Sequence, residues 1–314
     1  MPQSAPHPAL AGLPLVLGGN VFGWTTSLDQ SFAVLDAFYE AGGRMIDTAE
    51  IYSAWIPGNK GGESETHIGH WLASRGVRAD MRIGTKTGLG GGTDALAPAK
   101  VARALDASLE RLQTDYVDLY YAHRDQPDTP LDEVVDGFAA LMASGKVRSL
   151  GASNFTPERF AASLDSAKRQ GIPGYSVLQP GYNLVWRGEY PLALQELAVA
   201  HSVAVLPYYS LGAGFLTGKY RSPADFDTAR GSSAQMHAQN GWDALPVLDA
   251  VAKETGATQA QVALAWLRSR PGIYAPVASG TTPGQVANLV GAARLVLRAD
   301  QLARLTAVSV DKPG

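Results

Sequence analysis

Short runs of β-branched and aliphatic residues alternate with helical patterns along almost the whole chain. The runs lie at residues 15–17, 45–46, 81–85, 117–121, 147–150, 176–178, 203–206 and 273–278. Between the first two runs, Leu28, Phe32, Leu35 and Tyr39 recur at the spacing of one helix face. A chain that alternates strand and helix in this way folds into a parallel sheet with right-handed helical crossovers.

Two architectures satisfy this alternation, a closed barrel of eight strands and an open doubly wound sheet. The number of runs matches the eight strands of a (β/α)8 barrel. An open sheet that binds a dinucleotide carries Gly-x-Gly-x-x-Gly after its first strand, and residues 18–23 do not match it. We therefore predict an α/β fold, a (β/α)8 TIM barrel, as one domain over residues 1–314. Its core is expected at about 13–297, with a C-terminal helix to about 310.

The composition limits the kinds of partner. Apolar residues make up 46% of the 314 residues, which is ample material for a large core. The formal net charge is −3 and no basic stripe is present, so we expect neither a nucleic-acid nor a membrane partner. Cysteine is absent, which excludes disulfides and thiol chemistry. No signal peptide or membrane-spanning run precedes or interrupts the pattern, and we expect a cytoplasmic protein. The oligomeric state stays open, with a monomer favoured slightly.

Polar residues stand at the C-terminal ends of the predicted strands, where barrel enzymes carry their catalytic groups. Asp47, Lys86 and His123 end three successive strands, and Tyr52 follows the first of them closely. Taken singly, each has an ordinary structural explanation, such as a turn cap, a solvent-directed lysine or a core histidine. Their coincidence at consecutive strand ends favours a shared site at one rim of the barrel.

These four groups make chemical sense as a proton donor. A phenol with a pKa near 10 is a poor acid at neutral pH, and a neighbouring ammonium lowers that pKa. Asp47 would keep Lys86 charged, because a buried ammonium without a partner tends to lose its proton. His123 could donate a hydrogen bond to a carbonyl oxygen. Such a site donates a proton to oxygen while another group attacks carbon.

Several short segments resemble those of a known family. They are Ile-Asp-Thr-Ala at 46–49 with Ile-Tyr-Ser at 51–53, Gly-Thr-Lys-Thr-Gly at 84–88, and the run from Tyr116 to His123. Further segments are 145–148, 151–155, Gln-Pro-Gly-Tyr-Asn at 179–183 and Gly-Phe-Leu-Thr-Gly-Lys-Tyr at 214–220. Each is weak alone, but together, in order over about residues 15–297, they resemble the aldo-keto reductases.

The resemblance implies an enzyme that reduces a small-molecule aldehyde or ketone with NADP(H), or possibly NAD(H). By position, Tyr52 would be the general acid and Lys86 its pKa partner. Asp47 would hold Lys86, and His123 would orient the carbonyl of the substrate. No metal is implied.

The resemblance also implies where the cofactor binds. The nicotinamide carboxamide, its ring, the pyrophosphate and the adenosine would meet successive rim loops. The implied residues are Asp47, Ser153, Asn154, Gln179, Tyr208, Tyr209, Ser210, Leu211, Gly212, Gly214, Lys219, Ser279, Thr281, Gln285 and Asn288.

One departure from the family concerns cofactor preference. Members that prefer NADPH often carry Lys or Arg where this chain has Thr281. Lys219, Arg221 or Arg294 could compensate, and we expect NADPH to bind at least as well as NADH. The polar segment 221–242 is expected to be a lid that orders with cofactor. After the last strand, a helix is expected from 282 to about 297.

Two other functions stay open at this point. A cofactor-binding regulatory or redox-sensing subunit, like the potassium-channel β subunits, would keep the barrel with weak reductase activity. A Schiff-base enzyme with Lys86 as nucleophile would leave Tyr52 unexplained. Four tryptophans fall in predicted rim loops, where they either line a substrate site or pack under loops; they are Trp24, Trp55, Trp186 and Trp242.

Overall fold

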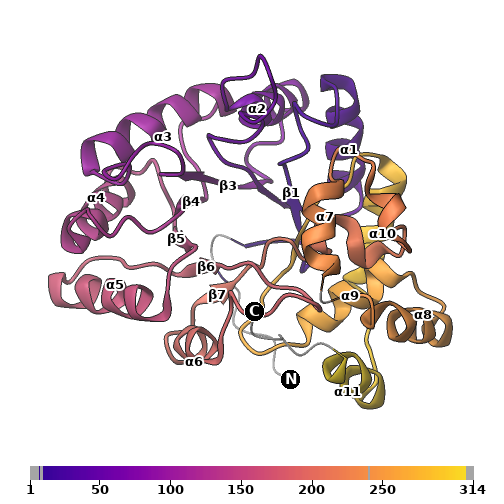
Figure 1. Cartoon of the computed structure of the whole chain (residues 1–314). Helices are drawn as coiled ribbons and strands as arrows, with labels where there is room; N and C mark the ends of the chain where they lie inside the picture. Colours follow the sequence, from indigo (N-terminus) through magenta and orange to yellow (C-terminus); the bar gives the residue numbers. More distant parts are fainter. Residues whose placement is uncertain (1–6, 8–9, 240, 309–314) are drawn as a thin grey trace.

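The computed structural model describes residues 7, 10–239 and 241–308, and it confirms the predicted eight-stranded barrel fold. All strand pairs in the sheet are parallel, in the order β7-β6-β5-β4-β3-β2-β1-β8 (Figure 1). The strands are β1 Val16–Gly18, β2 Met45–Asp47, β3 Arg82–Thr87, β4 Leu119–Ala122, β5 Leu150–Ser153, β6 Val177–Gln179, β7 Ala204–Val205 and β8 Val277–Ala278.

Backbone hydrogen bonds close the sheet between β7 and the segment that leads into β8. The Val205 amide donates to the Gly272 carbonyl oxygen at 3.1 Å, and the Tyr274 amide donates to the Val205 carbonyl oxygen at 2.9 Å. Further along, the Val277 amide donates to the Pro207 carbonyl oxygen at 2.9 Å. These bonds leave no free sheet edge at this position, as a barrel requires.

Helices follow the strands and cover the outside of the barrel (Figure 1). Thr156 caps α5, because its side chain accepts a hydrogen bond from the Arg159 amide at 3.3 Å, and Pro157 follows it at the start of the helix. The C-terminal helix ends at Ala307, and residues 309–310 of the prediction lie outside the described part. The helices are α1 Leu28–Glu40, α2 Glu63–Arg75, α3 Pro98–Leu112, α4 Leu131–Ala143, α5 Pro157–Gln170, α6 Leu192–Ala200, α7 Gly231–Ala238, α8 Ala244–Thr255, α9 Gln259–Arg268, α10 Pro283–Ala292 and α11 Ala299–Ala307.

The period of two along a strand decides which side chains reach the barrel interior. One buried apolar cluster takes Met45 from β2 and both Leu119 and Tyr121 from β4. Asp47 is two residues beyond Met45, and His123 is two residues beyond Tyr121. Both therefore point the same way as this interior cluster, at the C-terminal end of the barrel.

Within the described residues, no helix is both long and apolar enough to cross a bilayer.

The fifth strand begins later than its aliphatic run predicts. The run at 147–150 leads into β5, which covers Leu150–Ser153 and overlaps the prediction only at Leu150. Gly-Ala-Ser is a poor β-forming sequence, so it carries no strand signal. Gly151 has a steric reason to be there, because a Cβ at this position would collide with the ring of Tyr121 on the neighbouring strand. The predicted helix from 282 to about 297 is also shorter, since α10 ends at Ala292.

The segment 221–242 is not a plain loop. It contains a 3-10 turn, η2, at Pro223–Phe226 and the helix α7. Aromatic contacts anchor the segment at its other end, since the ring of Trp242 lies 5.3 Å from that of Phe215 and 5.9 Å from that of Phe226. A dependence of its order on cofactor, as expected for a lid, stays a prediction.

His237 attaches α7 to the barrel. Its side chain is buried, with the rings of Trp186 and Tyr209 at 5.2 and 5.0 Å. The amide nitrogen Nδ2 of Asn183 lies 3.3 Å from Nδ1 of His237. An amide nitrogen only donates, so Nδ1 accepts and Nε2 carries the proton. No described residue bonds to Nε2, and burial lowers the pKa of His237 to about 4.

Acidification is therefore expected to loosen α7. Above pH 6.5, the ordinary pKa of histidine, His237 is neutral both when α7 is packed on the barrel and when α7 is open. The free energy that holds α7 in place is then at its full value. As the pH falls toward 4, His237 takes up a proton mainly when α7 is open. The free energy of opening α7 therefore falls by about 3 kcal/mol. Hydrogen exchange of α7 peptides at pH 7 and pH 5, corrected for intrinsic rates, measures the part of this loss that falls between the two pH values, about 2 kcal/mol. The non-titrating variant His237→Phe should lack it, and an unchanged pH dependence in that variant would contradict the assignment.

Candidate active site

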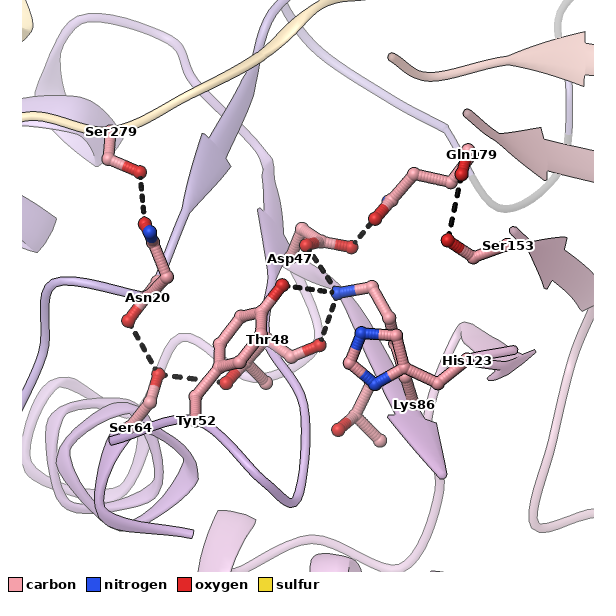
Figure 2. A network of polar contacts seen from close by, with 12 residues as sticks. Asn20, Asp47, Thr48, Tyr52, Ser64, Lys86, His123, Ser153, Gln179 and Ser279 are labelled. Atoms are coloured by element: carbon pink, nitrogen blue, oxygen red, sulfur yellow. Dashed lines mark hydrogen bonds and ion pairs between the residues drawn. The ribbon is translucent and has the colours of Figure 1, made fainter. Parts of the chain in front are cut away.

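The ammonium of Lys86 joins the residues that the sequence placed at one rim. Its Nζ lies 2.6 Å from Oδ2 of Asp47, 2.8 Å from the Thr48 carbonyl oxygen and 2.9 Å from the Tyr52 hydroxyl oxygen. Figure 2 shows the imidazole of His123 beside the same group, and its ring centroid is 6.1 Å from that of Tyr52. The four side chains thus meet at the C-terminal ends of β2, β3 and β4.

The number of hydrogens on Lys86 fixes the direction of these bonds. An ammonium has three N–H donors and no acceptor, and all three are used. Tyr52 must accept in its contact with Lys86, so the hydrogen of its own hydroxyl is free for another acceptor. The site therefore contains a phenol whose proton is available, supported from behind by a cation.

Glu50 holds the loop that carries Tyr52, although no motif in the sequence marks it. Its backbone amide donates to the Lys86 carbonyl oxygen at 3.2 Å. Its carboxylate accepts from the Thr87 hydroxyl at 2.7 Å and from the Gly88 amide at 3.1 Å. Burial raises the pKa of Glu50, against these two hydrogen bonds. The loop after β2 is therefore bonded to the end of β3, which keeps Tyr52 next to Lys86.

The direction of the Tyr52 pKa differs from the sequence-based expectation. Burial raises the pKa of Tyr52, and the lowering effect of Lys86 is smaller, while Asp47 raises it further. The expected net lowering by the ammonium is thus wrong for the free protein. Tyr52 holds its proton at neutral pH, which is the state that a proton donor needs.

Lys86 and His123 have opposite charge states at neutral pH. Burial lowers the pKa of Lys86, but Asp47 and Tyr52 outweigh it, and the net pKa is raised. Burial, with the positive charges of Lys86 and Arg124, brings the pKa of His123 well below its usual value. His123 is therefore a neutral imidazole. Its buried Nδ1 has no hydrogen-bond partner among the described residues.

Most of the residues expected at the nicotinamide are bonded to the four-residue site or to each other. Nε2 of Gln179 donates to Oδ1 of Asp47 at 2.8 Å, and the Ser153 hydroxyl donates to the Gln179 carbonyl oxygen at 2.8 Å (Figure 2). The Tyr208 hydroxyl donates to Oδ1 of Asn154 at 2.8 Å. Asn154 in turn donates to the His123 carbonyl oxygen at 2.8 Å. The structure brings these residues together, and their binding of a carboxamide stays a prediction.

The loop after β7 has an unusual backbone. Tyr209, Gly212, Ala213 and Gly214 all have positive φ, and Gly214 reaches +100°. Successive residues of this kind can form an anion-binding concavity with their amides, but here the Gly212 and Gly214 amides already donate to the Tyr209 and Leu211 carbonyl oxygens, at 2.7 and 3.0 Å. Ser210, within this loop, donates its hydroxyl to the Pro207 carbonyl oxygen at 2.8 Å, and Leu211 is half-buried.

The residues expected at the adenosine lie around the start of α10. The Ser279 hydroxyl donates to Oδ1 of Asn20 at 2.6 Å, and Oε1 of Gln285 accepts from the Thr281 amide at 2.8 Å. Asn288 lies on the side of α10 toward α9, because its Oδ1 accepts from the hydroxyl of Thr258 at 2.8 Å. A role for Asn288 at the cofactor stays a prediction.

The cations that might replace a charge at position 281 are not equally placed. Arg221 forms a bidentate pair with Asp249, at 2.8 and 2.9 Å, so its guanidinium is already engaged. Arg294 follows the far end of α10, about 15 Å along the helix from its start. Of these three cations, Lys219 remains as a candidate. It is exposed, and its Nζ lies 4.7 Å from the Tyr220 ring centroid.

The structure adds a cation, Arg230, that no motif in the sequence marks. Arg230 is half-buried directly before α7, and no described carboxylate forms an ion pair with it. Burial lowers the pKa of Arg230, against the influence of Tyr209 and Tyr220. A guanidinium that is partly removed from water without a counter-ion carries a desolvation cost. Arg230 interacts electrostatically with Tyr209, in the loop after β7.

Comparison with known proteins agrees with this arrangement. The model of the Aldo/keto reductase family matches residues 14–310. The chain belongs to the aldo/keto reductase family. This confirms the resemblance drawn from the motifs, and it makes an oxidoreductase the expected class of enzyme.

Three relatives illustrate the range of the family. Protein tas of Escherichia coli is 31% identical, over 96% of this chain and 96% of its own length. Aldo-keto reductase str7 of Strobilurus tenacellus is 33% identical, over 93% of this chain and 85% of its own length. A putative voltage-gated potassium channel subunit beta of Schizosaccharomyces pombe is 28% identical, over 87% of this chain and 83% of its own length.

Proposed function

We propose that this protein reduces an aldehyde or ketone to an alcohol with NAD(P)H, and that Tyr52 is its general acid. The observation that carries the proposal is the geometry of Lys86, whose three hydrogens are all donated and leave the Tyr52 hydrogen free. Membership of a reductase family supports the reaction class.

The residues present fit a nicotinamide dinucleotide. Lys219 and Arg230, which form no ion pair with a described carboxylate, would hold phosphate groups, and the loop at 212–214 would lie against them. Ser153, Asn154 and Gln179 would bind the carboxamide, and Tyr208 would lie against the ring. When bound, the cofactor supplies the hydride for the carbonyl carbon.

The protein's own side chains handle the oxygen. Neutral His123 donates one N–H to the carbonyl oxygen and orients it. Tyr52 then gives its free hydrogen to the alkoxide, which is a much stronger base than a phenolate, so the raised pKa of Tyr52 does not prevent the transfer. Lys86 stabilises the resulting phenolate across 2.9 Å, and Asp47 keeps Lys86 charged and in place.

We further propose a preference for NADP(H), supported by two cations without ion-pair partners in the described part of the chain, Lys219 and Arg230. The variant Arg230→Met should weaken NADPH binding by about 10- to 100-fold, because a hydrogen bond to a charged group contributes about 1.5–3 kcal/mol. Titration with NADPH and NADH measures it. A larger loss for NADPH would place Arg230 at the 2′-phosphate, and an equal loss at the pyrophosphate. An unchanged affinity for both cofactors would mean that Arg230 does not contact the cofactor. Arg221→Met is the matched control, because the Arg221 guanidinium is already paired with Asp249.

Oxidation of NADPH followed by absorbance, with a panel of aldehydes and ketones, tests the proposed reaction. The relative named as a channel subunit favours a second candidate, a regulatory subunit that binds cofactor with weak turnover. Tight cofactor binding with no turnover over the whole panel would favour that role. Rapid turnover with one class of carbonyl would favour the enzyme.

A further inference from the structure

The loops after β2, β3 and β4 meet at Gly88, the residue that directly follows β3. The Gly88 amide donates to Oε1 of Glu50, in the loop after β2, at 3.1 Å. The Gly88 carbonyl oxygen accepts from Nε2 of Gln126, in the loop after β4, at 3.0 Å. Both backbone polar groups of one residue are thus bound by side chains from the two neighbouring loops. We call these three residues the Gly88 junction.

The junction lies close in the chain to the residues proposed to handle the proton. Glu50 is two residues before Tyr52, and its own amide donates to the Lys86 carbonyl oxygen at 3.2 Å. Gln126 is three residues beyond His123. The proposed acid and the imidazole therefore stand on two different loops, and the junction connects those loops.

The proposed reaction depends on the distance between these two loops. The Tyr52 hydroxyl and an N–H of His123 have to reach the same carbonyl oxygen, and a misplacement of about 1 Å can cost about 100-fold in rate. The two rings meet edge to face, with their centroids 6.1 Å apart. A ring contact of this kind sets a separation less strictly than hydrogen bonds do, because hydrogen bonds are directional.

The backbone at Gly88 suits a junction of this kind. Its φ is +97°, a conformation that residues with a side chain rarely adopt. A Cβ at this position would lie 2.4 Å from Cδ2 of Leu96, whose side chain is buried. Any other residue would have to shift the backbone, and the shift would move the amide and the carbonyl away from their two partners.

The directions of the two bonds decide which side chains can make them. A backbone carbonyl oxygen only accepts, so position 126 needs a donor, which Gln126 supplies from its amide nitrogen. A backbone amide only donates, so position 50 needs an acceptor. Oε1 of Glu50 meets this need, and it also accepts from the Thr87 hydroxyl at 2.7 Å. The junction is therefore a donor and an acceptor placed on opposite sides of one residue.

We propose that Gln126 and Glu50 are positioning residues, which bind the two polar groups of Gly88 and so hold the loops of Tyr52 and His123 at the spacing that the reaction requires. This rests on the proposed function, since it takes Tyr52 and His123 as the groups that meet the substrate oxygen. The two positioning residues act through the backbone of the loops and not on the substrate.

Removing the donor at position 126 tests the proposal. Gln126→Met keeps a side chain of similar length without an N–H group, and it should lower kcat for the best aldehyde of the panel by about 10- to 100-fold. KM and the affinity for NADPH should hardly change. Gln126→Lys, which supplies a donor again, should regain most of the lost kcat. A wild-type kcat in Gln126→Met would overturn the proposal.

A double variant tests whether the two side chains act as one unit. Glu50→Met removes the acceptor, and its kcat should fall at least as far as that of Gln126→Met. The double variant should lose little more than Glu50→Met alone, because either substitution already opens the junction. If the two losses multiplied instead, the residues would act separately, and the junction would be overturned.

Arg159→Met is the matched control in the loop after β4. Arg159, on α5, forms a bidentate pair with Asp125, the neighbour of Gln126, at 2.7 and 2.9 Å. Breaking this pair loosens the same loop but leaves the bond to Gly88 in place, so kcat should stay near the wild-type value. Urea unfolding corrects each rate for the folded fraction. An equal loss of kcat in Arg159→Met and Gln126→Met would overturn the role of the junction.

Hydrogen exchange separates failure of the junction from failure of the proposed function. The amides of Glu50, Tyr52 and Ala54 donate to backbone carbonyl oxygens at 3.2, 3.1 and 3.1 Å, so their exchange reports opening of the loop after β2. They should exchange about 3- to 10-fold faster in Gln126→Met, although that substitution lies in another loop, and at the wild-type rate in Arg159→Met.

This exchange result would support the junction even if the protein reduced no aldehyde. Unchanged exchange of the three amides in Gln126→Met, in a protein that does reduce aldehydes, would overturn the junction and leave the reductase function standing.

Discussion

Replacing Tyr52 with phenylalanine is expected to lower the rate of hydride transfer by about 10²–10⁴-fold, the usual contribution of a general acid. The ring stays, so its contacts with Trp55 and His123 are kept, and cofactor affinity should hardly change. Only the free hydroxyl hydrogen is lost. Single-turnover reduction of a good aldehyde substrate by the NADPH complex measures the rate.

The buried hydroxyl of Tyr120 provides the matched control. It donates to the Val101 carbonyl oxygen at 3.2 Å, on the helix side of the sheet. Tyr120→Phe should therefore lose some stability and keep its rate. If Tyr52→Phe retained more than about a tenth of the wild-type rate, another group, with His123 first in line, would be the acid.

Lys86→Met is expected to reduce hydride transfer comparably, for a different reason. The phenol survives, but the cation that stabilises its conjugate base is gone, and burial raises the pKa of Tyr52 unopposed. The variant should also be less stable by about 3–5 kcal/mol, because Asp47 becomes a buried charge without its partner. Single-turnover kinetics and urea unfolding measure the two effects separately.

A second buried ion pair shows which effect belongs to the site. Arg78 lies 2.9 Å from the fully buried Asp118, at the opposite end of β4 from His123. Arg78→Met should cost stability without changing the rate in the folded fraction. A Lys86→Met enzyme that transferred hydride at a wild-type rate once folded would reduce Lys86 to a structural role.

The strand count and the meeting of the four residues were predictable because each depends on a simple periodicity. Strands end where an aliphatic run ends, and alternation places Asp47 above Met45 at the same rim as Lys86 and His123. The direction of the Tyr52 pKa was not predictable. It depends on the balance between burial and the Lys86 charge, and burial is a property of the packed structure.

Long-range partners and small-residue helices also escaped the sequence analysis. Nothing near Arg221 in the sequence announces Asp249 as its partner, or Arg230 as a guanidinium without one. The helix α7 buries Ala234, His237 and Ala238, whose spacing is helical. Two of these are alanines and the third is polar, so no hydrophobic period was visible.

The bond between Gln179 and Asp47 joins parts of the chain that have separate tasks. Asp47, Tyr52, Lys86 and His123 all come from the first half, on β2 to β4 and the loop after β2. Apart from Asp47, the residues proposed for the cofactor come from the second half, from β5 onward. The 2.8 Å hydrogen bond from Gln179 on β6 to Asp47 on β2 therefore links the cofactor half of the barrel to the proton-handling half. A substitution at Gln179 would thus disturb both the cofactor residues and the proton-handling residues, whereas a substitution at Lys219, at the far end of the loop after β7, leaves this bond in place.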